Sequence, residues 1–85
     1  MNRETIRTVV LKNLADAVEG LDPATIDSSK SMKELGANSL DIVEVVSCSM
    51  RELRIKVPRS ELADLKNIDQ LVDRLFERAS DRKAS

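Results

Sequence analysis

The sequence predicts an all-α fold: a small four-helix bundle with a long loop between the first two helices and a short third helix. Apolar residues recur at helical spacing in three segments, and only one of the 85 residues, Phe76, is aromatic. A core built from Leu, Ile, Val, Met and Ala favours helices over a β-sandwich, in which aromatic and β-branched residues usually dominate. Because this length buries one modest core, we expect one domain over residues 1–78 and a polar, frayed tail over 79–85.

The first helix is expected over residues 3–18. Gly20 follows it, and Asp22-Pro23 starts a loop. The apolar positions of this segment are spaced for one helical face, with charges on the remaining surface. They are Ile6, Val9, Val10, Leu14, Ala17 and Val18.

Residues 19–37 form the long loop. A loop of this length is uncommon in a compact domain and is often functional. Ile26, Met32 and Leu35 are its isolated apolar residues, and we expect them to anchor it on the core. Gly36 indicates a tight backbone turn immediately before the second helix.

The second helix is expected over residues 38–54. Asn38 is a strong N-cap, and Asp41 at N3 gives a capping-box-like arrangement that suits the positive end of the helix dipole. Pro58 bounds the helix on the far side. A short third helix over Ser60–Leu65 is then compatible with the spacing.

The last helix begins after Asn67, an N-cap with Gln70 at N3. Its apolar face consists of Ile68, Leu71, Val72, Leu75 and Phe76. Short connections between these pieces predict a compact bundle.

The second helix carries more apolar surface than a small domain can bury. One stripe contains Ile42, Val45, Val46 and Leu53, and a second, rotated stripe contains Leu40, Val43 and Met50. A surface helix buries one stripe, so the other is expected to face water and to serve as a partner-docking face. The alternative is that loop 19–37 folds over the second stripe.

Composition excludes several functions. A net charge of −1 and the absence of Trp and Tyr argue against nucleic-acid binding. Without His, and with Cys48 as the single cysteine, the chain offers neither a zinc-ligand set nor a histidine base. We expect Cys48 to be a small buried filler. The lone cysteine favours a reducing compartment, and no membrane span is apparent, so we expect a cytoplasmic protein without a metal or catalytic residues.

Ser39 is the residue with the clearest chemical potential. It lies at a helix N-terminus, where backbone N–H groups and the helix dipole favour a phosphate. The alternative is that Asn38-Ser39 merely caps the helix.

The string Leu35-Gly36-Ala37-Asn38-Ser39-Leu40-Asp41 resembles the phosphopantetheine attachment motif of acyl carrier proteins, and the pattern of helices and loops extends the resemblance over roughly residues 3–78. The resemblance implies that a phosphopantetheinyl transferase loads Ser39 with 4′-phosphopantetheine from coenzyme A, and that the protein acts as a monomer without catalytic activity. It implies a partner-docking face of Leu40, Asp41, Val43, Glu44, Met50 and Arg51. It also implies an acyl chamber lined by Val46, Ser49, Val57, Leu62 and Ala63.

The chain departs from the family pattern in two ways. Asn38 replaces the usual Asp, which leaves the choice of transferase open. Residues 39–64 contain five acidic and four basic side chains, a net charge of −1, where fatty-acid carriers are strongly acidic. We therefore expect shape and apolar contact to contribute more to docking than charge attraction.

A narrower resemblance lies in Val57-Pro58-Arg59-Ser60-Glu61-Leu62-Ala63 and Lys66-Asn67-Ile68. These segments are similar to the third-helix region of donor carriers in polyketide β-branching cassettes. This implies an acetyl or propionyl cargo, an HMG-CoA-synthase-like acceptor enzyme, and a ketosynthase-like decarboxylase or an acyltransferase that supplies the acyl group. The alternatives are a general fatty-acid, polyketide or amino-acyl carrier and, from another class, a non-covalent helical adaptor.

Overall fold

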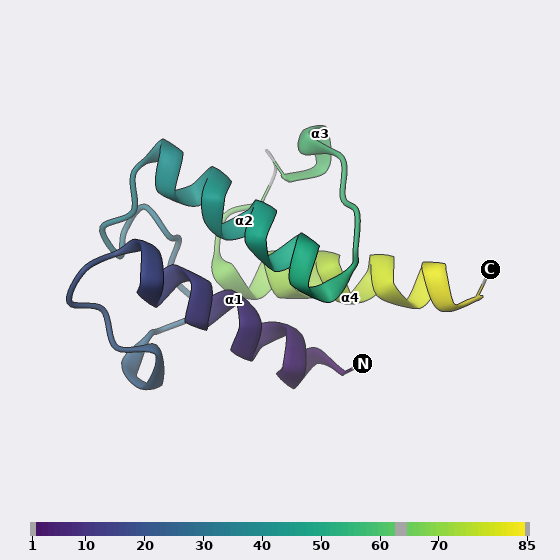
Figure 1. Cartoon of the computed structure of the whole chain (residues 1–85), viewed down its shortest axis with the longest axis horizontal. Coiled ribbons are helices and arrows are strands. Elements are labelled where there is room, and N and C mark those ends of the chain that lie inside the picture. The colour runs from purple at the N-terminus through teal and green to yellow at the C-terminus, as the bar shows by residue number, and fades with distance from the viewer. Residues whose placement is uncertain (1, 63–64, 85) are drawn as a thin grey trace.

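The computed structural model describes residues 2–62 and 65–84, and every regular element in them is helical (Figure 1). The elements are α1 (Arg3–Ala17), a 3₁₀ turn η1 (Pro23–Thr25), α2 (Ser39–Leu53), α3 (Arg59–Leu62) and α4 (Ile68–Ala84). The all-α prediction is confirmed, including the long first loop and the short third helix. Among the described residues, no helix combines the length and the apolar character needed to span a membrane.

Helix α1 begins at the predicted residue and ends at Ala17, one residue before the predicted end. The Asn2 side chain accepts a hydrogen bond from the Thr5 N–H at 2.8 Å and so caps the first turn. Val18 has extended backbone after the last turn, and Gly20 then adopts a left-handed φ of 85°.

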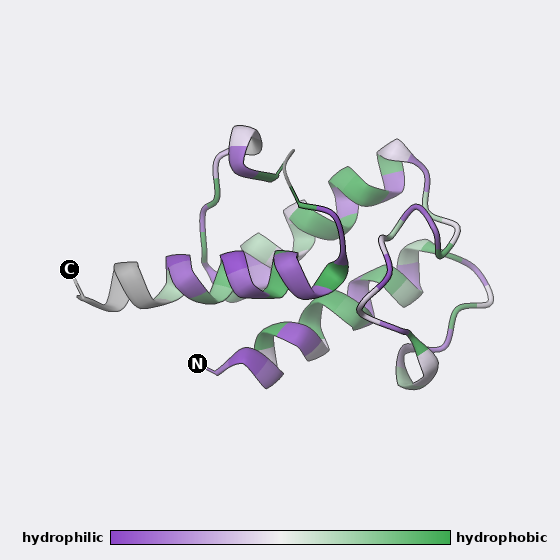
Figure 2. Ribbon diagram, turned by 180° about the vertical axis from the view of Figure 1, so that it is seen from behind, coloured by the Kyte–Doolittle hydropathy of each residue, from purple (hydrophilic) through white to green (hydrophobic). Residues whose placement is uncertain are grey.

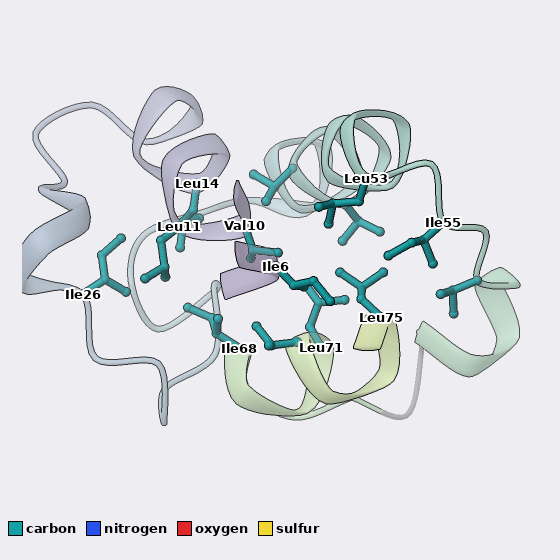
Figure 3. Packing of buried hydrophobic residues seen from close by; sticks show 14 of the residues in the cluster. Ile6, Val10, Leu11, Leu14, Ile26, Leu53, Ile55, Ile68, Leu71 and Leu75 are labelled. Atoms are coloured by element: carbon teal, nitrogen blue, oxygen red, sulfur yellow. The ribbon is translucent and has the colours of Figure 1, made fainter. Parts of the chain in front are cut away.

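The core lies between α1, α2 and α4. Helix α1 packs against both of the other long helices, and Figure 2 shows that all three carry hydrophobic as well as hydrophilic residues. The side chains of Ile6, Val10, Leu71 and Leu75 point toward one another in Figure 3, and each is at most 2% exposed. Aliphatic side chains therefore fill the centre of the core, and the single aromatic residue, Phe76, packs against it from a partly exposed position.

The long loop is held against the start of α4. Ile26 is buried as expected, while Met32 and Leu35 are partly buried against the core. The Ser28 and Lys30 carbonyls accept hydrogen bonds from the Asp69 and Ile68 N–H groups, at 2.9 and 3.1 Å. The loop therefore satisfies N–H groups that the first turn of α4 would otherwise leave unpaired.

Helix α4 has the predicted cap. Asn67 Oδ1 accepts from the Gln70 N–H at 2.8 Å, and Gln70 Oε1 accepts from the Lys66 N–H at 2.7 Å. The predicted apolar face is buried except for Phe76, which is partly exposed. The helix continues to Ala84 and so includes most of the segment for which we expected a frayed tail.

Helix α3 is a single turn that ion pairs tie to α4. The Glu61 carboxylate accepts hydrogen bonds from Arg74 Nη1 at 2.7 Å and from Arg78 Nη2. The helix covers Arg59–Leu62, whereas we expected it over residues 60–65. Residues 63 and 64 lie outside the described residues. The Arg74 hydrogen bond, followed by the contribution of Arg78, lowers the pKa of Glu61 below its ordinary value of 4.5.

The ion pairs between Glu61 and the two arginines predict a contribution to the free energy of unfolding that depends on pH. A carboxylate with a lowered folded-state pKa stabilises the protein above its unfolded pKa, and this stabilisation is lost as the pH falls through the folded pKa. We expect Glu61→Gln to lower the free energy of unfolding near pH 7, and we expect the difference from the wild type to shrink as the pH falls below 4.5 toward the lowered pKa of Glu61. Urea unfolding of both proteins across this range is the measurement. If the difference in the free energy of unfolding between the two proteins stayed constant as the pH fell, the charge of the Glu61 carboxylate would not be the source of the stabilisation.

Candidate functional site

Ser39 is the first residue of α2 and is exposed. The chain reaches it through a turn at Gly36, whose φ of 103° is a left-handed conformation that side chains rarely adopt. Ala37 is 3% exposed and anchors the turn on the core. This geometry presents Ser39 at the end of the helix, with its hydroxyl unbonded to any described residue.

Asn38, and not Ser39, caps the helix. Asn38 Oδ1 accepts from the Asp41 N–H at 2.8 Å, and Asp41 Oδ2 accepts from the Asn38 N–H at 3.2 Å. This reciprocal pair is the capping box that the sequence predicts. The Ser39 hydroxyl therefore remains available for chemistry.

The capping box gives a direct stability prediction. We expect Asn38→Ala to lower the free energy of unfolding by about 1 kcal/mol, because the Asp41 N–H loses its acceptor. Asn38→Asp keeps an acceptor and should change stability by only a few tenths of a kcal/mol. Urea unfolding separates the two variants, and equal destabilisation by both would contradict the capping role. The rate at which a transferase attaches phosphopantetheine to Asn38→Asp then measures the effect of the negative charge that acyl carrier proteins usually have at this position.

The start of α2 fits a phosphate ester on Ser39. The serine is exposed, and the first helical turn supplies the positive end of the helix dipole. Asp41 lies in this turn, but its carboxylate is engaged by the Asn38 N–H. Among the described residues, no group of three or more His, Cys, Asp or Glu side chains is arranged to hold a metal ion.

The second apolar stripe of α2 faces outward near Ser39. Leu40 is 80% exposed and Val43 48% exposed, so loop 19–37 does not cover them. Glu44 and Arg51 are also exposed, whereas Met50 is partly buried. Of the residues expected on the docking face, Asp41 is partly buried and forms the cap.

An apolar cavity of about 300 Å³ lies between α2 and the segment that contains α3. We call it the interhelical cavity. Three of the expected chamber residues, Val46, Val57 and Leu62, line it together with Ile42 and Met50. A neighbouring cavity of about 270 Å³ shares Ile42, Val46 and Leu62. Ala63 lies outside the described residues.

Ser49 was wrongly expected in this chamber. It is 0% exposed, and its Oγ accepts a hydrogen bond from Asn13 Nδ2 of α1 at 3.1 Å. Ser49 therefore belongs to the α1–α2 interface, where Asn13 satisfies its buried hydroxyl. Cys48 was expected to be buried, but it is only partly buried.

Ile42 and Met50 were not among the expected chamber residues. Together with Val46 they form an i, i+4, i+8 row on one side of α2. That row could have been read from the sequence, but the sequence does not show which neighbouring segment the row faces.

Comparisons with known proteins identify the family of this chain. The chain matches the family described as "Phosphopantetheine attachment site" over residues 9–75. It is 31% identical over 78 residues to the polyketide biosynthesis acyl-carrier-protein AcpK of Bacillus subtilis (strain 168), covering 92% of this chain and 95% of that protein. It is 34% identical over 71 residues to an acyl carrier protein of Campylobacter concisus, covering 82% of this chain and 86% of that one. For an acyl carrier protein of Campylobacter hominis the identity is 39% over 69 residues, covering 81% and 82%.

No solved structure gives a significant match. The family match covers most of the chain, and the relatives are matched over most of their own lengths. The helical fold and the exposed serine at the start of α2 agree with that assignment. The chain belongs to the acyl carrier proteins, the family that carries 4′-phosphopantetheine.

Proposed function

We propose that this carrier holds an acetyl or propionyl group on a 4′-phosphopantetheine attached to Ser39 and donates it to an HMG-CoA-synthase-like enzyme in polyketide β-branching. The observation that carries the proposal is the similarity to a polyketide-biosynthesis carrier over 92% of this chain. The helix α3 region adds support, since it resembles the corresponding region of donor carriers.

The arm has a suitable attachment point and a suitable cavity. Ser39 is exposed at the start of α2, with the dipole of the helix behind it. When bound, 4′-phosphopantetheine supplies a terminal thiol that holds an acyl group as a thioester. The interhelical cavity of about 300 Å³ is lined mainly by aliphatic side chains, which suit the apolar part of an acyl group.

The proposal includes partners and excludes catalysis by the chain itself. A phosphopantetheinyl transferase attaches the arm, and a ketosynthase-like decarboxylase or an acyltransferase supplies the acyl group. The exposed Leu40 and Val43 then offer apolar contacts to each enzyme in turn. We place this monomeric carrier in the cytoplasm, in line with its single cysteine.

A general acyl carrier is the second candidate. It is favoured by the matches to the Campylobacter acyl carrier proteins, one of which reaches 39% identity. The near-neutral segment 39–64 counts against a fatty-acid carrier of the usual acidic kind.

Acyl transfer distinguishes the two. The holo-protein is charged with acetyl or propionyl and offered to an HMG-CoA-synthase-like enzyme with a β-ketoacyl acceptor carrier. The Campylobacter hominis acyl carrier protein, charged in the same way, is the control. We expect kcat/KM to be at least about tenfold higher for this carrier. Equal donation by both proteins would refute the donor role and favour the general carrier.

A further inference from the structure

An open groove of about 950 Å³ lies at the end of α2 opposite to Ser39. We call it the basic groove. Four cationic side chains line it, from Arg51, Arg54, Lys56 and Arg78, and its apolar part includes Met50 and Val57. No carboxylate of the described residues lines it. Of the lining cations, Arg78 is already paired with the Glu61 carboxylate.

The basic groove makes α2 electrically asymmetric. Asp41 and Glu44 lie in the half of the helix next to Ser39, whereas Arg51 and Arg54 lie at the other end, where the one acidic residue, Glu52, is paired with Lys12 of α1. A helix of 15 residues spans about 22 Å at 1.5 Å per residue. Residues 39–50 carry two acidic and no basic side chains, whereas residues 51–64 carry four basic and three acidic ones, so the basic side chains of this segment all lie in its second part.

The backbone at Arg54 shapes the groove. Arg54 adopts the left-handed conformation, with φ 57° and ψ 41°, and the Ile55 N–H donates to the Met50 carbonyl at 3.0 Å. This turn ends α2 and leads directly to Lys56 and Val57, which line the groove. Glycine is the usual residue in this conformation because it lacks a Cβ. The chain instead has an arginine, which adds a cation to the groove.

We propose that the basic groove docks an acidic, amphipathic segment of an enzyme that acts on this carrier. Carboxylates of that segment would pair with Arg51 and Lys56, and its apolar side chains would cover Met50 and Val57. A ligand that is only anionic would leave the apolar part in water, so charge and hydrophobicity together favour a protein segment. This inference rests on the carrier function. It extends the docking face expected along α2, which already includes Met50 and Arg51, to about 20 Å from Ser39, and so sets the direction in which the partner lies along the helix.

The test uses the full-length apo-protein and two labelled synthetic helical peptides of about 16 residues. Both peptides have leucines at i, i+3 and i+4 spacing; the remaining positions of one are mainly glutamate and those of the other mainly lysine. We expect fluorescence anisotropy to show binding of the acidic peptide, weakened by added salt. Arg51→Glu combined with Lys56→Glu should weaken that binding by at least about tenfold. Lys30→Glu, an exposed loop substitution, should change it by less than about twofold.

Several outcomes would overturn the proposal. Equal binding of the acidic and basic peptides would do so, as would full binding of the acidic peptide to the double variant. Binding to phosphatidylglycerol vesicles without binding to the acidic peptide would assign the groove to a membrane instead. NMR shift changes should centre on residues 50–57, and changes confined to α1 would refute the site.

The outcome of the peptide-binding assay does not depend on whether this carrier donates an acyl group. The binding assay involves neither the arm nor an acyl group, so it can succeed even if acyl donation fails. Mass spectrometry of Arg51→Glu/Lys56→Glu after incubation with coenzyme A and a transferase checks that Ser39 still accepts the arm. Circular dichroism checks that the double variant retains its helices.

Discussion

Ser39→Ala is expected to abolish attachment of phosphopantetheine while leaving the fold intact. The substitution removes the exposed hydroxyl at the first residue of α2. That hydroxyl bonds to no described residue, and Asn38 provides the helix cap, so the free energy of unfolding should change by less than about 0.5 kcal/mol. Intact-protein mass spectrometry after incubation with coenzyme A and a broad-specificity transferase measures loading, and urea unfolding measures stability.

Ser47→Ala is a matched control on the same helix. Ser47 is partly buried and away from the helix start, so this variant should load like the wild type. A mass gain of one arm on Ser39→Ala would place the attachment on another residue. No gain on the wild type with several transferases would mean either that Asn38 prevents recognition or that Ser39 is not an attachment site, and a non-covalent adaptor would then become the better interpretation.

Leu75→Ala is expected to have the largest effect on stability. Leu75 is 0% exposed and lies on α4 in the core that α1 and α2 also form. Its truncation removes apolar contacts and leaves a cavity, which should lower the free energy of unfolding by about 3 kcal/mol. Small domains have only about 5–15 kcal/mol in total. The shift in the urea midpoint, with an unchanged slope, is the measurement.

Leu40→Ala makes the same chemical change on the surface. Leu40 is 80% exposed, so its truncation should alter stability by less than about 0.5 kcal/mol. Its effect should instead be a higher KM for enzymes that act on the carrier, with kcat unchanged. Equal destabilisation by both substitutions would show that the exposed stripe packs against the protein in solution. An unchanged KM would remove Leu40 from the docking face.

Much of the fold follows from local sequence. The caps at Asn38 and Asn67 mark the beginnings of α2 and α4, because a side-chain oxygen can satisfy an N–H only three residues away. Helical periodicity identified the buried face of α4, and Gly36 marked the turn before Ser39. The motif around Ser39 is also local, so the family could be recognised before its structure was described.

The tertiary structure decided what depends on contacts between distant segments. Ser49 was expected in the acyl chamber, but Asn13 on α1 binds it, and the sequence alone does not reveal that pairing. The route of the long loop follows from the hydrogen bonds that the Ile68 and Asp69 N–H groups donate to the Lys30 and Ser28 carbonyls, which lie far away in the chain. The basic groove likewise combines Lys56 with Arg78 of α4. The sequence determined the helices, their caps and the serine, because these depend on neighbours within a few residues. Only the folded chain determined the cavities and the grouping of charges, because packing brings remote side chains together.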